Sequence, residues 1–376
     1  YSMPLSASFA GARDHFNAAI AICEKWGVKS LCLLDGFVFD TADLTSDGVH
    51  ATAEGYDIMQ PHINGLLEEM RPVPQAVYNA VFKKQEILPP VEGGGALYSA
   101  EENPYKDTLK ILALGNSFSA DATKHLWGIA NSYGVKNVVI GNMSIGGCSL
   151  DTHYENIVND AAAYGYTKWT SLDHVNASNT AISTALKDED WDIITIQQAS
   201  GENLVFDNPD NKYDSTANPV DTYSKLDEIL DYLNQNKPKE STKILWHMTW
   251  AYQADSTHKA FAAYGKDQMV MYNSLLDRAQ ELKGKYTDIA GVLPSGTAIQ
   301  NLRGTSVGDT VTRDGYHMSY GLGRYTVALT WYCYITGANP YNVKYIPADY
   351  TSDIAPYKDE IAASVAEAIQ DPYNKR

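Results

Sequence analysis

The strongest constraint on the fold is an alternation of short apolar segments with longer helical patterns from Thr108 onward. The short segments predict strands at Leu109–Leu114, Asn137–Ile140, Asp192–Ile196, Lys243–Met248 and Ile289–Leu293. Between and after them, apolar periodicity predicts helices at Ala120–Tyr133, Ala177–Leu186, Tyr223–Asn234, Lys266–Leu282 and Gly321–Tyr334. Because right-handed crossovers cover both faces of such a sheet, we expect an α/β fold: a three-layer α/β/α, doubly wound parallel sheet.

The chain has 376 residues, enough for one large domain or two ordinary ones. Residues 71–107 contain PVPQ and PPVEGGG, which resist regular structure, so we interpret this range as a linker. The pattern of residues 1–70 predicts a partial α/β segment with one strand between helices. We therefore expect a main domain at 108–376 and a smaller N-terminal part.

Charge and hydropathy exclude several classes of protein. The net charge is −17, whereas nucleic acids and anionic membranes are bound by clustered Lys and Arg, so we expect neither partner. A run of about 18 apolar residues is absent, so we expect no membrane span. Because Cys23, Cys32, Cys148 and Cys333 form no CxxC pair, we favour four free thiols.

The chain begins at Tyr1, with neither Met nor a signal peptide. Two explanations remain open: an export signal has been removed, or an upstream part of the protein is missing. We expect an exported protein, located in the periplasm, at the cell surface or outside the cell.

Functional groups in a doubly wound sheet gather beyond the carboxyl ends of the strands. The strand LKILAL runs directly into GNSFS, which places Ser117 on the turn between strand and helix. A helix N-terminus carries partial positive charge that favours a developing anion. Ser117 is therefore a candidate nucleophile, although a serine in this place is often only a helix cap.

A serine hydroxyl needs a base, and RDGYH supplies one far downstream. His317 can act as the general base, and Asp314, three residues earlier, can orient the imidazole and stabilise its cation. The alternative is a capping aspartate beside a surface histidine. A catalytic arrangement requires Ser117 Oγ to lie within about 3 Å of His317 Nε2.

Two further blocks follow intermediate strands and could provide an oxyanion hole. Gly146 and Gly147 offer backbone N–H groups, and Gln197 and Gln198 offer side-chain amides. Because successive strand residues face opposite ways, we expect one glutamine to face the site, and we favour Gln198. Each block taken alone could also be a turn or a cap.

The order of these blocks resembles the SGNH (GDSL-like) hydrolase superfamily, over roughly Thr108 to Ala338. The chain looks most similar to a bacterial subgroup with GNSFS, GGCSL, WDIITIQQAS and RDGYHMS blocks. This resemblance implies Ser117 as nucleophile, His317 as base and Asp314 as its orienting partner. It also implies an oxyanion donor at one of the two glycines. The chain departs from the superfamily pattern where Asn116 replaces Asp and where the third block has Gln instead of Asn.

A second motif of the same kind stands near the N-terminus. The sequence TSDGVH resembles the terminal SGNH block, with Asp47 and His50 in its DxxH positions, but no serine block precedes it. The segment could be the remnant of a degenerate domain, the end of a longer two-domain protein, or part of a site completed by another chain. We favour the first two, because a base without a nucleophile cannot run the triad reaction.

Substrate contacts are expected after the KILWHM strand, where Trp250, Tyr252 and His247 could hold a sugar ring or an acyl group. Packing beneath a loop is the alternative for these side chains. The His, Cys and Glu spacings of metal sites are absent, so we predict no metal and no cofactor.

The sequence therefore favours a serine esterase that forms an acyl-enzyme on Ser117. The resemblance suggests a small acyl group on a carbohydrate as substrate, although a fold does not define the ester. A non-catalytic carbohydrate-binding or scaffold protein on the same fold remains the alternative, and acyl transfer to an acceptor other than water is a third.

Overall fold

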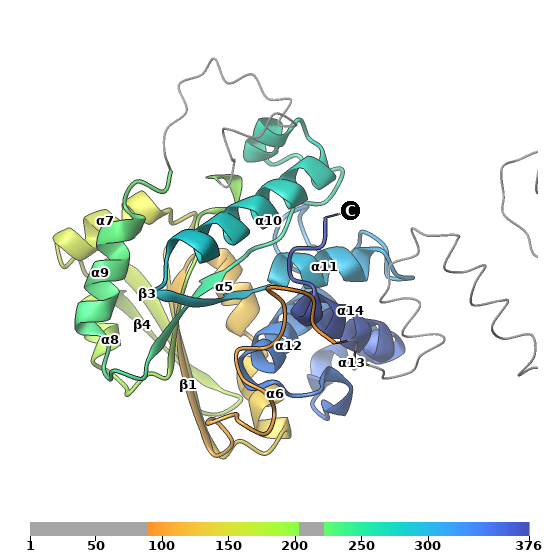
Figure 1. The fold of residues 1–376 in the computed structure, drawn as a ribbon, viewed down its shortest axis with the longest axis horizontal. Coiled ribbons are helices and arrows are strands. Elements are labelled where there is room, and N and C mark those ends of the chain that lie inside the picture. Colours follow the sequence, from red (N-terminus) through yellow and green to blue (C-terminus); the bar gives the residue numbers. More distant parts are fainter. Residues whose placement is uncertain (1–86, 88, 203–221, 376) are drawn as a thin grey trace, which may run out of the picture. The chain divides into compact units, whose positions relative to one another are not determined.

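The computed structural model describes residues 87, 89–202 and 222–375 (Figure 1). Its sheet has seven strands in the order β4-β3-β2-β1-β5-β6-β7. The strands are β1 Thr108–Gly115, β2 Asn137–Ser144, β3 Tyr164–Trp169, β4 His174–Thr180, β5 Ile193–Ile196, β6 Lys243–His247 and β7 Ile289–Leu293. The neighbouring pairs β2–β1, β1–β5, β5–β6 and β6–β7 are all parallel, which confirms the expected α/β fold.

Burial explains why the central strands are uninterrupted apolar runs. All four residues of β5 are buried, as is every residue of β1 from Ile111 to Gly115. Strands enclosed on both faces have no polar side to alternate with. Figure 1 shows α7, α8 and α9 on one side of the sheet and α6, α12 and α14 on the other.

The helices expected from the sequence are present in whole or in part, and the structure adds others. Their bounds are α5 Ser117–Thr123, α6 Leu126–Ser132, α7 Leu150–Val158, α8 Ile182–Leu186, α9 Leu226–Asn236, α10 Gln268–Lys285, α11 Ser295–Arg303, α12 Leu322–Thr336, α13 Thr351–Ile354 and α14 Lys358–Gln370. The helix expected at Ala120–Tyr133 is two helices that meet near His125. The sequence analysis did not predict α7, α11, α13 and α14.

One edge of the sheet differs from the prediction of an all-parallel sheet. β3 pairs antiparallel with β2, and β4 pairs antiparallel with β3, so the sheet is mixed. The first half of the helix expected at Ala177–Leu186 belongs to β4 instead, because these polar residues lie on an exposed edge strand. Only Ile182–Leu186 is helical, where apolar side chains return to the core.

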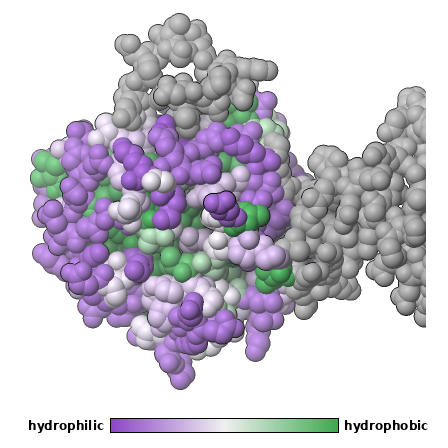
Figure 2. Space-filling model, in the orientation of Figure 1, coloured by the Kyte–Doolittle hydropathy of each residue, from purple (hydrophilic) through white to green (hydrophobic). Residues whose placement is uncertain are grey.

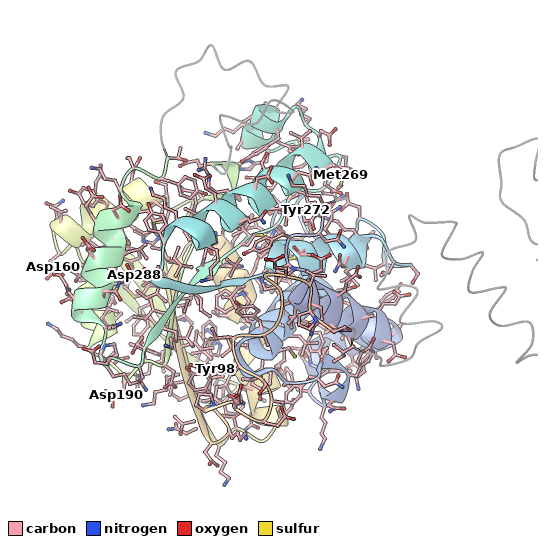
Figure 3. The ribbon with its side chains drawn as sticks, viewed as in Figure 1. Tyr98, Asp160, Asp190, Met269, Tyr272 and Asp288 are labelled. Atoms are coloured by element: carbon pink, nitrogen blue, oxygen red, sulfur yellow. The ribbon has the colours of Figure 1, made fainter. Side chains whose placement is uncertain are left out.

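The described part of the expected linker is attached to the main domain. Gly95 N donates to Ile369 O, and Leu97 N donates to Tyr334 O. Tyr98, labelled in Figure 3, contacts the buried ring of Tyr105 edge-to-face with 5.6 Å between centroids. This stretch therefore folds onto α12 and α14. The predictions for residues 1–70 and 71–86, including those for Asp47, His50, Cys23 and Cys32, lie outside the described residues.

The surface seen in Figure 2 is hydrophilic around its rim, with apolar residues gathered toward its middle.

Cys148 and Cys333 are free and buried, as expected for these two thiols. No helix within the described ranges is long and apolar enough to cross a bilayer.

Candidate active site

Ser117 lies where the central strand of the sheet passes into a helix. β1 ends at Gly115, Asn116 caps the helix, and α5 begins at Ser117. Asn116 Oδ1 accepts a hydrogen bond from Phe118 N at 2.9 Å, which fixes the first turn. A side chain at Gly115 would come within 3.0 Å of Ser119 and Gln197, so the tight passage requires glycine. The turn therefore presents Ser117 at the carboxyl edge of the sheet.

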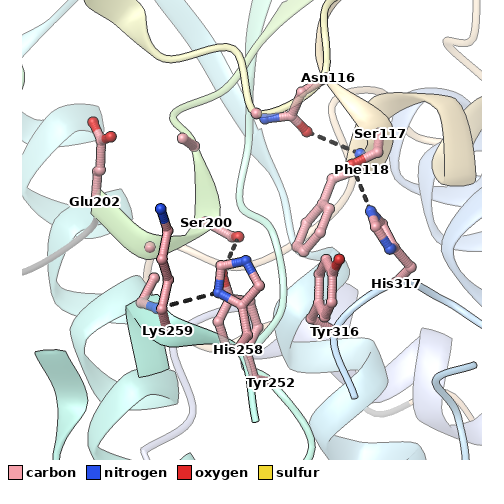
Figure 4. A pocket seen from close by; sticks show the side chains of 15 residues that line it. Asn116, Ser117, Phe118, Ser200, Glu202, Tyr252, His258, Lys259, Tyr316 and His317 are labelled. Carbon is pink, nitrogen blue, oxygen red and sulfur yellow. Dashed lines mark hydrogen bonds between the residues drawn. The ribbon is translucent and has the colours of Figure 1, made fainter. Parts of the chain in front are cut away.

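Two hydrogen bonds connect Ser117 to His317 and His317 to Asp314, and Figure 4 shows the first of them. Ser117 Oγ lies 2.8 Å from His317 Nε2, and His317 Nδ1 lies 2.6 Å from Asp314 Oδ2. The nucleophile and the base are thus within the range that proton transfer needs. The structure brings together the three residues that the sequence motifs singled out, although Ser117 and His317 are 200 positions apart.

The loop between Arg313 and Met318 holds the two partners in register. Asp314 Oδ1 accepts the backbone N–H of His317 at 2.8 Å and that of Tyr316 at 3.3 Å. Gly315 has a φ of +89°, a conformation that favours glycine. Burial would raise the pKa of Asp314, but hydrogen bonds from the side chain and backbone of His317 lower it on balance. The carboxylate therefore stays ionised and can stabilise an imidazolium.

Asn116 joins three blocks of the site through both polar atoms of its side-chain amide. Its Nδ2 donates to Cys148 O at 3.1 Å, and its Oδ1 accepts from Gln197 Nε2 at 3.0 Å. Gln197 Oε1 in turn lies 2.9 Å from Nδ1 of the buried His247. A carboxylate could accept from Gln197 but has no hydrogen to donate to Cys148 O. The neutral amide satisfies both neighbours.

Gly146 and Gly147 line the same cavity as Ser117. Gly147 has a φ of +67°, whereas the space around both glycines is open, so backbone conformation and not crowding requires glycine at 147. Their backbone N–H groups are the donors that the sequence put forward for an oxyanion.

The expectation that Gln198 faces the site is wrong. Its Oε1 accepts from Leu150 N at 3.0 Å and Ala199 N at 2.7 Å, and its Nε2 donates to Thr222 O at 2.6 Å. Neither Gln198 nor Gln197 lines the cavity. The reason is that β5 ends at Ile196, so both glutamines follow the strand and its alternation of faces does not apply to them. Both side chains secure backbone and side-chain groups inside the domain.

The three expected substrate contacts separate into one lining residue and two buried ones. Tyr252 lines the cavity, and its hydroxyl lies 2.8 Å from Ser200 Oγ. Trp250 is fully buried, stacks on Phe118 with 4.4 Å between centroids, and donates its Nε1–H to Tyr316 O. Burial lowers the pKa of His247 to about 3, so that imidazole is neutral. Trp250 and His247 therefore support the site from beneath.

The cavity beside Ser117 has a volume of about 640 Å³, within the range of small-molecule sites. The sequence did not single out five of its lining residues, which are Ser200, Glu202, His258, Lys259 and Tyr316. Ser200 and Tyr316 lie inside the recognised QQAS and RDGYH blocks, whereas no motif marks the other three. The five come from the segments after β5 and β6 and from the Asp314–His317 loop. Figure 4 shows His258 and Lys259 on the wall across from Ser117 and His317.

His258 is the second imidazole of the cavity. Its Nδ1 accepts the backbone N–H of Ala260 at 3.2 Å, so in the neutral ring Nε2 carries the hydrogen. Its pKa is lowered by burial first and then by His317 and Lys259. The ring of Tyr316 lies between the rings of His258 and His317, with centroid distances of 4.5 and 4.1 Å. His258 is thus a neutral hydrogen-bond donor beside the base. Within the described residues, no cluster of His, Cys, Asp or Glu could hold a metal ion.

Comparison with known proteins gives a family but no activity. The model of a family described as a domain of unknown function, DUF4886, matches residues 110–364. No curated protein matches the chain significantly. A solved protein from Slackia heliotrinireducens, proposed to be an SGNH hydrolase, is 16% identical and covers 59% of this chain and 96% of its own, with a TM-score of 0.38. That likeness is too weak to indicate a common function.

A second solved structure is much more similar. It is a DUF4886 family protein from Bacteroides uniformis, 36% identical, and the match covers 72% of this chain and 98% of that one with a TM-score of 0.64. Together with the family model, which spans more than half of the sequence, this match shows that the chain belongs to the DUF4886 family.

Proposed function

We propose that this protein is a serine ester hydrolase of the SGNH type, with Ser117 as nucleophile, His317 as general base and Asp314 as its orienting partner. The observation that carries the proposal is the continuous line of hydrogen bonds from Ser117 Oγ through the imidazole to Asp314 Oδ2. A helix N-cap alone would not need this partner. The line opens onto a cavity large enough for a small ester.

The reaction follows from these positions. His317 Nε2 takes the hydroxyl proton as Ser117 Oγ attacks the ester carbonyl, and Asp314 stabilises the imidazolium. Backbone N–H groups at Gly146 and Gly147 stabilise the negative oxygen of the tetrahedral intermediate. His317 returns the proton to the leaving oxygen, which departs as an alcohol and leaves an acyl-enzyme. Water, activated by His317, then releases the acid and regenerates Ser117.

For the substrate we propose a small acyl group on a carbohydrate. The support is the mixture of aromatic and polar groups on the cavity wall. Tyr252 and Tyr316 offer flat ring faces, and His258, Lys259 and Glu202 offer a donor, a cation and an acceptor for hydroxyl groups. Burial, and to a smaller extent Asp151, raise the pKa of Glu202, which lies half-buried in this wall.

Hydrolysis of 4-nitrophenyl acetate by the full chain and by Ser117→Ala tests the proposal. We expect the variant to lose all activity above the uncatalysed rate and to lose labelling by a fluorophosphonate. Ser132→Ala is the matched control, because Ser132 Oγ only donates within α6 to Ile129 O. Equal activity in the wild type and Ser117→Ala would rule out the triad. A folded wild type that neither hydrolyses nor labels would instead indicate a binding or scaffold protein.

A further inference from the structure

Asp121 is a buried carboxylate on the same short helix as Ser117, and the reaction described above does not use it. Its side chain is 1% exposed. It follows Ser117 by four residues in α5, so the two side chains project from the same side of the helix. Buried carboxylates are costly unless cations and N–H donors compensate them, and the partners of Asp121 show what this one holds.

Four hydrogen bonds converge on this carboxylate. Met318 N donates to Oδ2 at 2.9 Å, and Arg313 Nη1 reaches both oxygens at 3.0 and 3.2 Å. Arg324 Nε, from α12, donates to Oδ1 at 2.7 Å. Arg313 precedes Asp314 and Met318 follows His317, so one carboxylate binds both ends of the segment that carries the base.

The segment itself is closed on its own backbone. Arg313 N donates to His317 O at 3.0 Å, and Ser319 N donates to Val311 O at 2.8 Å. The guanidinium of Arg313 also donates to Met318 O. A loop closed in this way moves as a unit, so its position relative to α5 depends on the bonds that join the two.

We propose that Asp121 is a positioning residue that sets the separation and angle between Ser117 Oγ and His317 Nε2. The inference rests on the proposed hydrolase reaction. Asp121 attaches the ends of the Arg313–Met318 loop to α5. The Ser117–His317 hydrogen bond then joins the same helix to the middle of the loop. Because a displacement of about 1 Å can reduce a rate by about 100-fold, loss of this attachment reduces turnover more than substrate binding.

The experiment compares kcat and KM of the full chain and Asp121→Asn with 4-nitrophenyl acetate. The amide keeps an oxygen for Met318 N but loses the charge, and its own N–H groups face the two guanidiniums. We expect kcat to fall about 10- to 100-fold with KM within about twofold. The labelling rate at saturating fluorophosphonate should fall by the same factor.

Asp192→Asn is the matched control for a purely structural effect. Asp192 is also a buried carboxylate that accepts one backbone N–H, from Lys110 at 2.8 Å, and one cation, Lys239 Nζ at 2.5 Å. It precedes β5, so it lies at the amino ends of the parallel strands, away from Ser117. We expect this variant to lower Tm while kcat stays within about twofold of the wild-type value.

If Asp121→Asn fails to fold, a second variant, Arg313→Gln, tests the same positioning role. It removes the hydrogen bonds from the guanidinium to Asp121 and leaves the carboxylate in place. The inference is overturned if the folded variants keep kcat within about twofold, or if Asp192→Asn lowers kcat as much as Asp121→Asn does. A folded wild type without any activity overturns the proposed reaction, and the positioning role with it.

Discussion

The side-chain amide of Asn116 donates a hydrogen bond to the backbone oxygen of Cys148 at 3.1 Å. This bond joins the turn that presents Ser117 to the loop that presents Gly146 and Gly147. The candidate nucleophile and the candidate oxyanion donors therefore share one fixed connection. Its chemistry depends on an amide, because Asn116 must accept from Phe118 N and Gln197 Nε2 and also donate to Cys148 O.

Replacing Asn116 by Asp tests this connection. The carboxylate would face the Cys148 carbonyl without a hydrogen to share, at a cost of about 1–3 kcal/mol in the free energy of unfolding. We expect kcat for an aryl acetate to fall more than about tenfold, because the glycine loop loses its attachment. Urea unfolding and steady-state kinetics measure the two effects.

Asn131→Asp is the control for this prediction. Asn131 Nδ2 also donates to a backbone oxygen, that of Val135 at 3.3 Å, but on α6 and outside the cavity. Its stability should fall while kcat is preserved. An Asn116→Asp variant with wild-type kcat would contradict the role assigned to the amide.

The second prediction concerns Asp314→Asn. The amide cannot stabilise an imidazolium and can hold His317 in the wrong tautomer, so we expect kcat to fall about 10³- to 10⁴-fold with the fold intact. In the wild type burial would raise the pKa of Asp314, but its hydrogen bonds with His317 lower it on balance, so the carboxylate is ionised at neutral pH and its contribution is lost only as the pH falls through the lowered pKa. A pH–rate profile should therefore show no loss attributable to Asp314 above pH 4. An acid limb that disappears in Asp314→Asn would count against this assignment.

The third prediction separates Gln198 from the oxyanion donors. Gln198→Met removes hydrogen bonds to Leu150 N and Thr222 O, and we expect a loss of about 1–3 kcal/mol in stability with kcat within about threefold. Gly147→Ala, at a φ of +67°, should instead lower kcat by displacing a backbone N–H beside Ser117. Chemical unfolding and acetate hydrolysis of both variants test the contrast. A larger loss of kcat in Gln198→Met than in Gly147→Ala would contradict this contrast and support Gln198 as an oxyanion donor.

The fourth prediction is acid destabilisation by buried imidazoles. Burial lowers the pKa to about 4 for His125 and His153 and to about 3 for His247. In the unfolded chain these histidines have pKa values near 6.5, so below that pH they bind protons that they do not bind in the folded chain. The free energy of unfolding is therefore unaffected by them above pH 6.5 and falls as the pH is lowered toward 4. With three such groups the slope reaches about 4 kcal/mol per pH unit. Melting curves from pH 8 to pH 4.5 measure it, and His125→Gln should flatten the decline; an unchanged slope would contradict this account.

Sequence patterns predicted the features that depend on local chemistry. Continuous apolar runs bounded by turns predicted the strands of the parallel sheet, and the ordered motifs selected Ser117, Asp314 and His317, which the structure brings into contact. The catalytic role of these three residues stays a prediction. The strand β2 extends four residues beyond the expected Ile140, through polar Asn142 and Ser144, because its pairing with β1 and not its hydropathy holds it.

Features that depend on long-range packing were not predictable. The polar residues of β3 and β4 form strands because they pair along an exposed edge, and hydropathy gives no sign of that. His247 ends β6 and Trp250 follows it. Both were offered as substrate contacts, yet His247 packs against Trp331 of α12 and Trp250 stacks on Phe118. His258 and Lys259 line the cavity, and no motif in the sequence marks them.

The 200-residue interval between Ser117 and His317 has a consequence for how this domain acquires its chemistry. Closing a loop of this length costs more conformational entropy than closing a short one, although the cost grows only slowly with length. During synthesis the serine leaves the ribosome long before the histidine does, so the nascent chain carries an inert hydroxyl until α12 can dock. Hydrolytic turnover would therefore report completion of the whole domain and not the folding of its N-terminal half.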